Sequence, residues 1–172
     1  MKVENNSKMD KNINRLTLKL HPKLKGLNLQ TKYFNLRPYN SLEFKKIDIG
    51  IIEESFISIF VSNKNEKLYN LQEGESIYID GVFQIEEFKH LDAYLNRDIC
   101  FISNDVGLAP FLRFIKKESG CFLYDIKNSK HILRRDHYFI YGTKDYCMKI
   151  KEELMIKYKL NNIDFTIKFI EN

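Results

Sequence analysis

Apolar and polar residues alternate along much of the first half of the chain, which is typical of strands with one buried face. The alternating runs cover residues 16–20, 47–51, 57–61 and 77–79. A further apolar stretch, KYFNLRP at residues 32–38, lies between the first two runs, and a short helical pattern, EKLYNL, precedes Gly74. Several short strands with little helix favour a small antiparallel barrel or sandwich.

The second half has a different texture, because its apolar segments are continuous rather than alternating. These segments are DICFIS, CFLYDI, HYFIYG and DFTIKFI, at residues 98–103, 121–126, 137–142 and 164–170. Continuous apolar strands that alternate with helical patterns indicate a parallel sheet in an α/β domain. A complete doubly wound domain has six strands, so four segments predict a shortened one, with the loop KNSKHILRRD replacing one or two βα units.

Two helices are predicted within this half. The first follows NDVGLAP, where Pro110 suits the first helical position and Gly120 can end the helix. The second follows HYFIYG, with Thr143 or Asp145 as its N-cap. The apolar face of the second helix is formed by Cys147, Ile150, Leu154 and Tyr158.

The predicted fold is therefore a small β-barrel followed by a truncated α/β domain. The first thirteen residues are polar, and we expect residues 1–13 to be a disordered basic arm. The barrel domain is then expected at residues 14–97 and the α/β domain at residues 98–172.

Charge and composition add little to this picture. The net charge of +5 is concentrated in residues 1–26, which hold seven Lys or Arg against two acidic residues. A solvated basic tail is a commoner arrangement than a polyanion-binding one, and no specific nucleic-acid partner is predicted. No apolar run approaches membrane-spanning length and the first residues are polar, so we expect a cytoplasmic protein without membrane insertion. The three cysteines are interpreted as reduced core residues.

Three segments in this order of elements resemble the ferredoxin reductase superfamily. They are KYFNLRPYN at residues 32–40, ICFISNDVGLAPFLRFIKK at residues 99–117 and YFIYGTKDYCMKIKEEL at residues 138–154. Between the first two, KLYNLQEGESIYIDGVF has the family's sequence of short helix, glycine turn and strand. Within the superfamily the chain is most similar to the dihydroorotate dehydrogenase electron-transfer subunit and its sulfide-dehydrogenase-like relatives.

The resemblance implies an FAD site in the barrel. Arg37, Pro38, Tyr39 and Asn40 resemble the family's Arg-Pro-Tyr-Ser motif, which supplies a cation for the flavin phosphates, an aromatic face and a hydrogen-bond donor. A competing register places the motif in KKIDIGI at residues 45–51, which would leave Arg37 and Tyr39 as a strand end. Lys67, in the segment NKNEKL, is a second candidate for phosphate binding, and a solvated turn is the alternative.

The resemblance also implies a nicotinamide nucleotide at the turn after the first α/β strand. Asn104, Gly107 and Pro110 occupy that turn, with Gly142 and Thr143 at the later Cys-Gly-Pro position of the family. Asp105 opposes pyrophosphate binding at the same turn. The alternative interpretation is that these residues are turn and cap residues of structural importance only.

The function implied is an FAD-binding, NAD(P)H-linked oxidoreductase or electron-transfer protein that works with a redox partner protein. The alternative is a non-catalytic member that serves as a binding module or as the subunit of a partner enzyme. The close relatives carry a four-cysteine iron-sulfur set that three scattered cysteines cannot supply, so no such cluster is expected.

Overall fold

The computed structural model describes residues 1–29, 31–94, 96–112, 114 and 121–170. The chain divides into two compact units, residues 1–85 (unit 1) and residues 86–172 (unit 2). Unit 1 contains the predicted barrel, and unit 2 contains the predicted parallel sheet.

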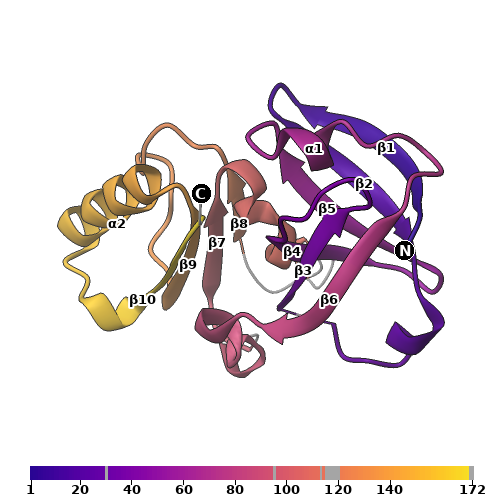
Figure 1. Ribbon diagram of the computed structural model, residues 1–172. Helices are drawn as coiled ribbons and strands as arrows, with labels where there is room; N and C mark the ends of the chain where they lie inside the picture. Colours follow the sequence, from indigo (N-terminus) through magenta and orange to yellow (C-terminus); the bar gives the residue numbers. More distant parts are fainter. Residues whose placement is uncertain (30, 95, 113, 115–120, 171–172) are drawn as a thin grey trace. The chain divides into compact units, whose positions relative to one another are not determined.

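Unit 1 is an antiparallel sheet that closes on itself. Its strands are β1 (Val3–Asp10), β2 (Ile13–Lys19), β3 (Lys32–Pro38), β4 (Lys45–Ile52), β5 (Phe56–Ser62) and β6 (Ile77–Gln84). They lie in the order β1-β2-β5-β4-β3-β6, and every pairing is antiparallel. The start of β1 returns to the start of β6, where Lys2 bridges Ser76 and the Val3 N–H donates to the Glu75 carbonyl (Figure 1). The predicted barrel is confirmed.

The alternating residues of these strands form the core of unit 1. Leu16 and Leu18 of β2, Phe34 and Leu36 of β3, and Ile57 and Ile59 of β5 are fully buried. Burying one such side chain contributes about 1.5–3 kcal/mol, so the period-two pattern accounts for the stability of the sheet. Two short helices complete the unit, η1 (Pro22–Leu24) and α1 (Glu66–Tyr69), and Leu68 of α1 packs into this core.

The structure corrects the expectation that residues 1–13 are a disordered arm. They contain β1, which pairs with β2 along its length and buries Val3 in the core. The polar composition of this strand is compatible with order because the Asn6 amide donates to the Tyr69 and Leu71 carbonyls, at 2.9 and 2.7 Å. Backbone pairing and such side-chain bonds leave no apolar pattern in the sequence.

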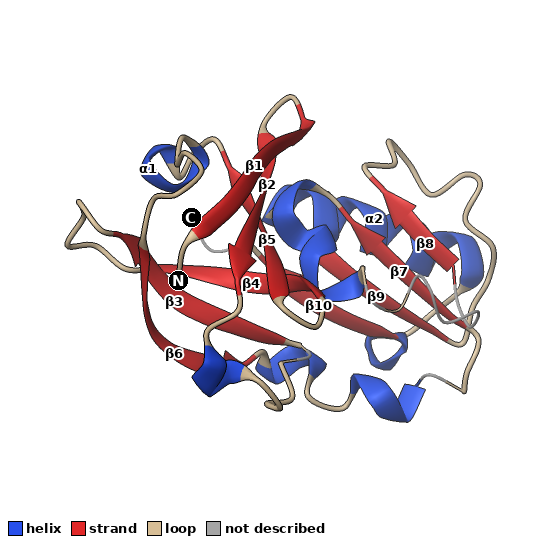
Figure 2. Ribbon diagram, turned by 90° about the vertical axis from the view of Figure 1, so that its right-hand side faces the viewer, coloured by secondary structure: helices blue, strands red, loops and turns tan. Residues whose placement is uncertain are grey.

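Unit 2 is a parallel sheet with a long helix on one face (Figure 2). The strands β7 (Ile99–Ser103), β8 (Cys121–Tyr124), β9 (His137–Gly142) and β10 (Phe165–Phe169) lie in the order β10-β9-β7-β8. All three pairings are parallel. The helix is α2 (Lys144–Tyr158), and the short helices are η2 (Glu86–Phe88), η3 (Leu91–Tyr94), η4 (Asp105–Phe111) and η5 (Asn162–Asp164). The four predicted strands are confirmed.

The two predicted helices have different outcomes. The helix after HYFIYG is α2, whose N-cap residue is Thr143 and whose buried residues are Cys147, Ile150 and Leu154. The turn that contains Pro110 forms the 3-10 helix η4, in which Pro110 lies inside rather than at the first position. The remainder of that predicted helix, up to Gly120, falls almost entirely outside the described residues.

The boundary between the units differs from the expected one at residue 97. Residues 86–97 belong to unit 2, and the side chains of Phe88, Leu91 and Tyr94 pack there. The Phe88 ring lies 5.2 Å from Phe111 and 5.7 Å from Tyr141, and Leu91 is buried.

Candidate functional site

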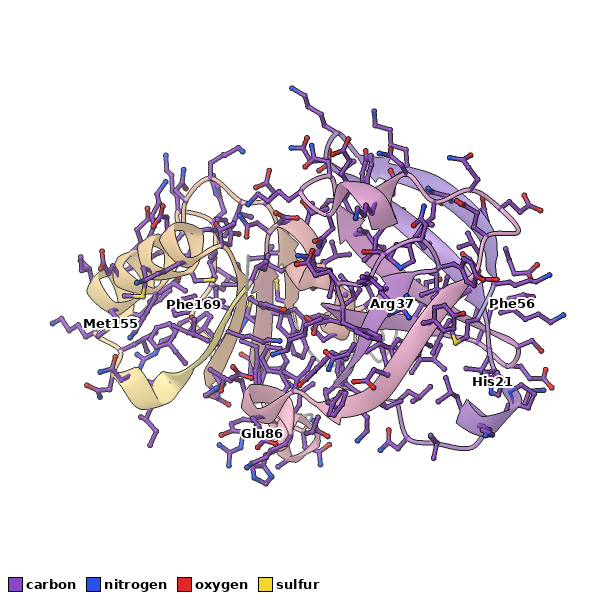
Figure 3. The ribbon with its side chains drawn as sticks, viewed as in Figure 1. His21, Arg37, Phe56, Glu86, Met155 and Phe169 are labelled. Carbon is purple, nitrogen blue, oxygen red and sulfur yellow. The ribbon has the colours of Figure 1, made fainter. Side chains whose placement is uncertain are left out.

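Arg37, which is labelled in Figure 3, lies near the end of β3 and fixes the segment that follows this strand. The Arg37 guanidinium donates to the Ser41 carbonyl at 2.5 Å and lies over two aromatic rings, 4.5 Å from the centre of Tyr78 and 5.2 Å from that of Phe44. These contacts close the turn between β3 and β4. Arg37 therefore shapes this turn, with its positive charge held between two aromatic faces.

Tyr39 and Asn40 form the outer part of the same turn. The Tyr39 side chain is 69% exposed and stacks on Tyr78, with ring centres 5.5 Å apart. Both Tyr39 and Asn40 line a pocket of about 330 Å³, together with Leu71, Glu75 and Ser76. An exposed aromatic face beside a pocket is suited to stacking on a planar ring.

A second pocket, of about 220 Å³, lies on the other side of this turn and is rich in charge. Its lining residues are Pro38, Ser41, Glu43, Lys45, Lys64, Asn65, Glu66, Lys67 and Leu68. Three lysines thus face two glutamates, and the Lys45 ammonium lies 2.5 Å from the Glu43 carboxylate. This hydrogen bond and the positive charge of Lys67 lower the pKa of Glu43. The second pocket is therefore cationic in balance, with Lys64 and Lys67 contributed by the α1 region.

The two pockets share the β3–β4 turn as a common wall. Pro38 and Ser41 line the cationic pocket, whereas Tyr39 and Asn40 line the aromatic one. We call the two pockets together the barrel site. A ligand with a planar ring and an anionic group would meet both surfaces of the turn.

The turn after β7 in unit 2 is filled by the side chain of Asn104. Its Oδ1 accepts a hydrogen bond from the Thr143 N–H at 2.9 Å, and its amide donates to the Thr143 hydroxyl at 3.4 Å. A Cβ added to Gly142 would lie 1.9 Å from the same Oδ1 atom. Gly142 is thus required by the close approach of Asn104, which occupies the space beside it.

The other residues of this turn have structural partners as well. A Cβ on Gly107 would lie 2.4 Å from the Tyr141 carbonyl, so this glycine permits η4 to pack on β9. Asp105 has a φ of 50°, and its carboxylate accepts a hydrogen bond from the Val106 N–H at 2.8 Å. Pro110 is buried within η4. These contacts hold the turn together, whereas neither Asn104 nor Thr143 caps its helix through a side-chain hydrogen bond.

Several solved structures of other proteins have a similar architecture. No family model matches the chain, and no curated protein matches its sequence. A flavohemoglobin from Malassezia yamatoensis, with bound FAD and heme, superposes with a TM-score of 0.75 at 10% identity over 99% of this chain and 59% of that chain. The FAD/NAD-binding domain of nitric oxide dioxygenase from Vibrio cholerae O1 biovar El Tor gives 0.66 at 12% identity, over 98% and 96%. A ferredoxin NADP+ reductase from Neisseria gonorrhoeae, with bound FAD and NADP, gives 0.66 at 11%, also over 98% and 96%.

The fold is ferredoxin reductase-like. The three superpositions cover 98–99% of this chain, and therefore both its barrel and its parallel sheet, and identities of 10–12% bear on the fold alone. The particular resemblance to the dihydroorotate dehydrogenase subunit stays a prediction. The chain spans 59% of the length of the flavohemoglobin.

Within this ferredoxin reductase-like fold, the sequence-predicted residues fall into two groups. Pro38, Tyr39, Asn40 and Lys67 line the barrel site, and Arg37 shapes its turn. Lys45 is the first residue of KKIDIGI, the segment of the competing register, and it also lines the cationic pocket.

The second group of predicted residues belongs to the unit 2 turn. Asn104 and Thr143 bond each other there, beside Gly142, and Gly107 and Pro110 belong to the packed helix η4.

Sequence reasoning missed Tyr78, whose ring stacks on Tyr39 beside the aromatic pocket. Tyr78 stacks on Tyr39 only because β6 pairs with β3, with Tyr78 directly opposite Arg37. Such a pairing between distant segments leaves no local signal in the sequence. Within the described part of the chain, no group of three or more His, Cys, Asp or Glu side chains is placed to hold a metal ion, and no helix is long and apolar enough to cross a membrane.

Proposed function

We propose that the protein binds FAD at the barrel site and acts as a flavin-dependent redox protein. The observation that carries this proposal is the pairing of an aromatic pocket with a cationic pocket across one turn. Lys64 and Lys67 would pair with the flavin phosphates, and Tyr39 would stack on a ring of the cofactor.

The donor set of the barrel site fits such a ligand. Lysine is a phosphate partner through its point charge, and Tyr39 offers a face that is exposed rather than buried in the core. Arg37 would position Tyr39 by holding the turn, through its bond to the Ser41 carbonyl. When bound, the flavin supplies hydride or single-electron transfer, whereas the protein supplies binding, orientation and charge.

The nicotinamide part of the expected function has weaker support. The residues of the unit 2 turn do not fit a dinucleotide, because the Asn104 side chain fills the space beside Gly142 and the Asp105 carboxylate lies at the same turn. We therefore derive no step through a nicotinamide nucleotide. The proposed electron donor or acceptor is a separate redox partner protein.

Flavin binding by the purified full-length chain tests the proposal. The Lys64→Ala/Lys67→Ala double variant should bind FAD at least about tenfold more weakly, because each charge-assisted hydrogen bond contributes about 1.5–3 kcal/mol. Binding is measured by equilibrium dialysis or by quenching of flavin fluorescence. Lys8→Ala/Lys11→Ala is the matched control, since both lysines are exposed on the β1–β2 hairpin.

A colourless protein that cannot be reconstituted with FAD would contradict the proposal. The filled turn in unit 2 specifically favours a second candidate, a non-catalytic binding module that keeps the fold. Tyr39→Ala separates the two candidates as well, because it should weaken flavin binding. The midpoint of thermal unfolding of the protein should stay nearly unchanged, since Tyr39 is exposed.

A further inference from the structure

Two cysteines that are far apart in the sequence face each other in unit 2. Cys100 of β7 and Cys121 of β8 are directly opposed in the parallel register. Both belong to the apolar cluster that α2 covers, so their side chains point to the same face of the sheet. The two thiols are close enough for Cys121 to raise the pKa of Cys100.

This placement is compatible with a covalent bridge. Neighbouring strands lie about 4.7–4.9 Å apart, which falls within the range of about 4.4–6.8 Å found between the Cα atoms of disulfides. Both cysteines are free thiols in the structure. Closure of a disulfide would thus join two strands that are already neighbours.

The two thiols differ in their access to solvent. Cys100 is fully buried, whereas Cys121 is half-buried on β8, the edge strand of the sheet. A small oxidant would therefore reach Cys121 first. Cys100 would be the second, resolving thiol.

Arg135 adds a positive charge beside the pair. Its guanidinium forms an ion pair with Asp98, and its Nε atom is buried without a hydrogen-bond partner. Burial and the neighbouring Cys121 raise the pKa of the Cys100 thiol, and the charge of Arg135 acts in the opposite direction. The reactive thiolate is thus disfavoured by burial and partly restored by Arg135.

We propose that Cys100 and Cys121 form a redox-active dithiol that closes into a disulfide by exchange with a small-molecule disulfide such as oxidised glutathione. The Cys121 thiolate attacks one sulfur of the oxidant and releases one glutathione thiolate. The Cys100 thiolate then attacks the Sγ atom of Cys121 and releases the second. Two electrons pass from the two cysteines to the oxidant, and the two thiol protons leave to solvent. This proposal is independent of flavin binding.

Intact-chain mass spectrometry after incubation with oxidised glutathione tests the proposal. The wild-type chain should lose two hydrogens and retain no glutathione, and dithiothreitol should reverse the change. Cys147→Ser is the matched control and should behave like the wild type, because Cys147 lies on α2, where its thiol contacts the Lys168 carbonyl. Cys100→Ser should instead trap one glutathione on Cys121, and Cys121→Ser should react at least about tenfold more slowly.

Peptide mapping of the oxidised wild type gives a result that does not depend on the variants' folding. A linked pair of peptides that contain Cys100 and Cys121 supports the proposal. A stable mixed disulfide at Cys121, or a bridge that includes Cys147, would overturn it.

The rate of closure provides a second readout. It should rise with pH above neutrality, because the thiolate fraction of Cys100 increases as the pH approaches its raised pKa. Arg135→Gln should slow closure several-fold relative to Arg134→Gln, whose residue is exposed. Equal rates in these two variants would show that Arg135 has no part in the exchange.

Discussion

His137 is a titratable group that is buried at the start of β9. Its Nε2 atom lies 2.8 Å from the Thr166 hydroxyl, and its ring contacts Tyr94 and Phe139, with centres 4.6 and 4.8 Å away. Burial lowers the pKa of His137; the charge of Arg97 acts in the same direction, and Asp164 opposes it. Folding therefore favours the neutral form of this imidazole.

This burial predicts a pH dependence of stability. The unfolded chain takes up a proton on His137 near the ordinary pKa of about 6.5, whereas the folded chain takes it up only at lower pH. The free energy of unfolding should therefore fall as the pH is lowered through 6.5. Denaturant titrations at a series of pH values should show a shallower fall in His137→Gln than in His131→Gln, the exposed control. Parallel pH profiles of the two variants would contradict the prediction.

At the scale of elements, α2 holds the loop that replaces the missing βα units. The Lys157 ammonium donates to the carbonyls of Ser129, Lys130 and Ile132, at 3.1, 2.8 and 2.8 Å. The Glu153 carboxylate accepts from the Ser129 N–H at 2.6 Å. Two side chains of α2 thus form hydrogen bonds with backbone groups of a loop that has no regular secondary structure of its own.

Replacing Lys157 should loosen this loop. We expect Lys157→Met to lower the free energy of unfolding by about 1–3 kcal/mol, because it leaves carbonyl groups without their charged donor. Lys151→Met, on the same helix, is the matched control. The measurement is the denaturation midpoint at constant slope, and equal midpoints in the two variants would argue against the loop-holding role of Lys157.

A comparison of the observed strands with the predicted ones shows which parts of the molecule could be predicted from the sequence. Strands such as β2 and β9 were predicted because burial of one or both faces leaves a hydrophobic pattern within a few residues. β1 was missed because backbone pairing and Asn6 hold it, and neither leaves such a pattern. The contact of Cys100 with Cys121 and that of Tyr39 with Tyr78 depend on strand register, which the local sequence does not encode.

For the molecule as a whole, the division after residue 85 means that unit 2 begins at residue 86 rather than at residue 98, where the sequence predicts the start of the α/β domain. The smallest fragment expected to fold as unit 2 is therefore residues 86–172. The Phe88 side chain is buried among Phe111, Phe139 and Tyr141, with ring centres 5.2, 6.3 and 5.7 Å away. Leu91 is also buried, and Tyr94 packs edge-on against Phe139. A boundary at residue 97 would remove all three side chains from the core of the parallel sheet.

A comparison of two fragments tests this division. Residues 86–172 should unfold in a cooperative transition, whereas residues 98–172 should lack one, because loss of a buried Phe alone costs about 3–5 kcal/mol and a small domain has about 5–15 kcal/mol in total. Thermal unfolding followed by near-ultraviolet circular dichroism distinguishes the two cases. Phe88→Ala in the full-length chain provides the matched measurement, since it should lower the stability of unit 2 without shortening the chain. Equal cooperativity in both fragments would place residues 86–97 outside the folding unit and restore the boundary at residue 97.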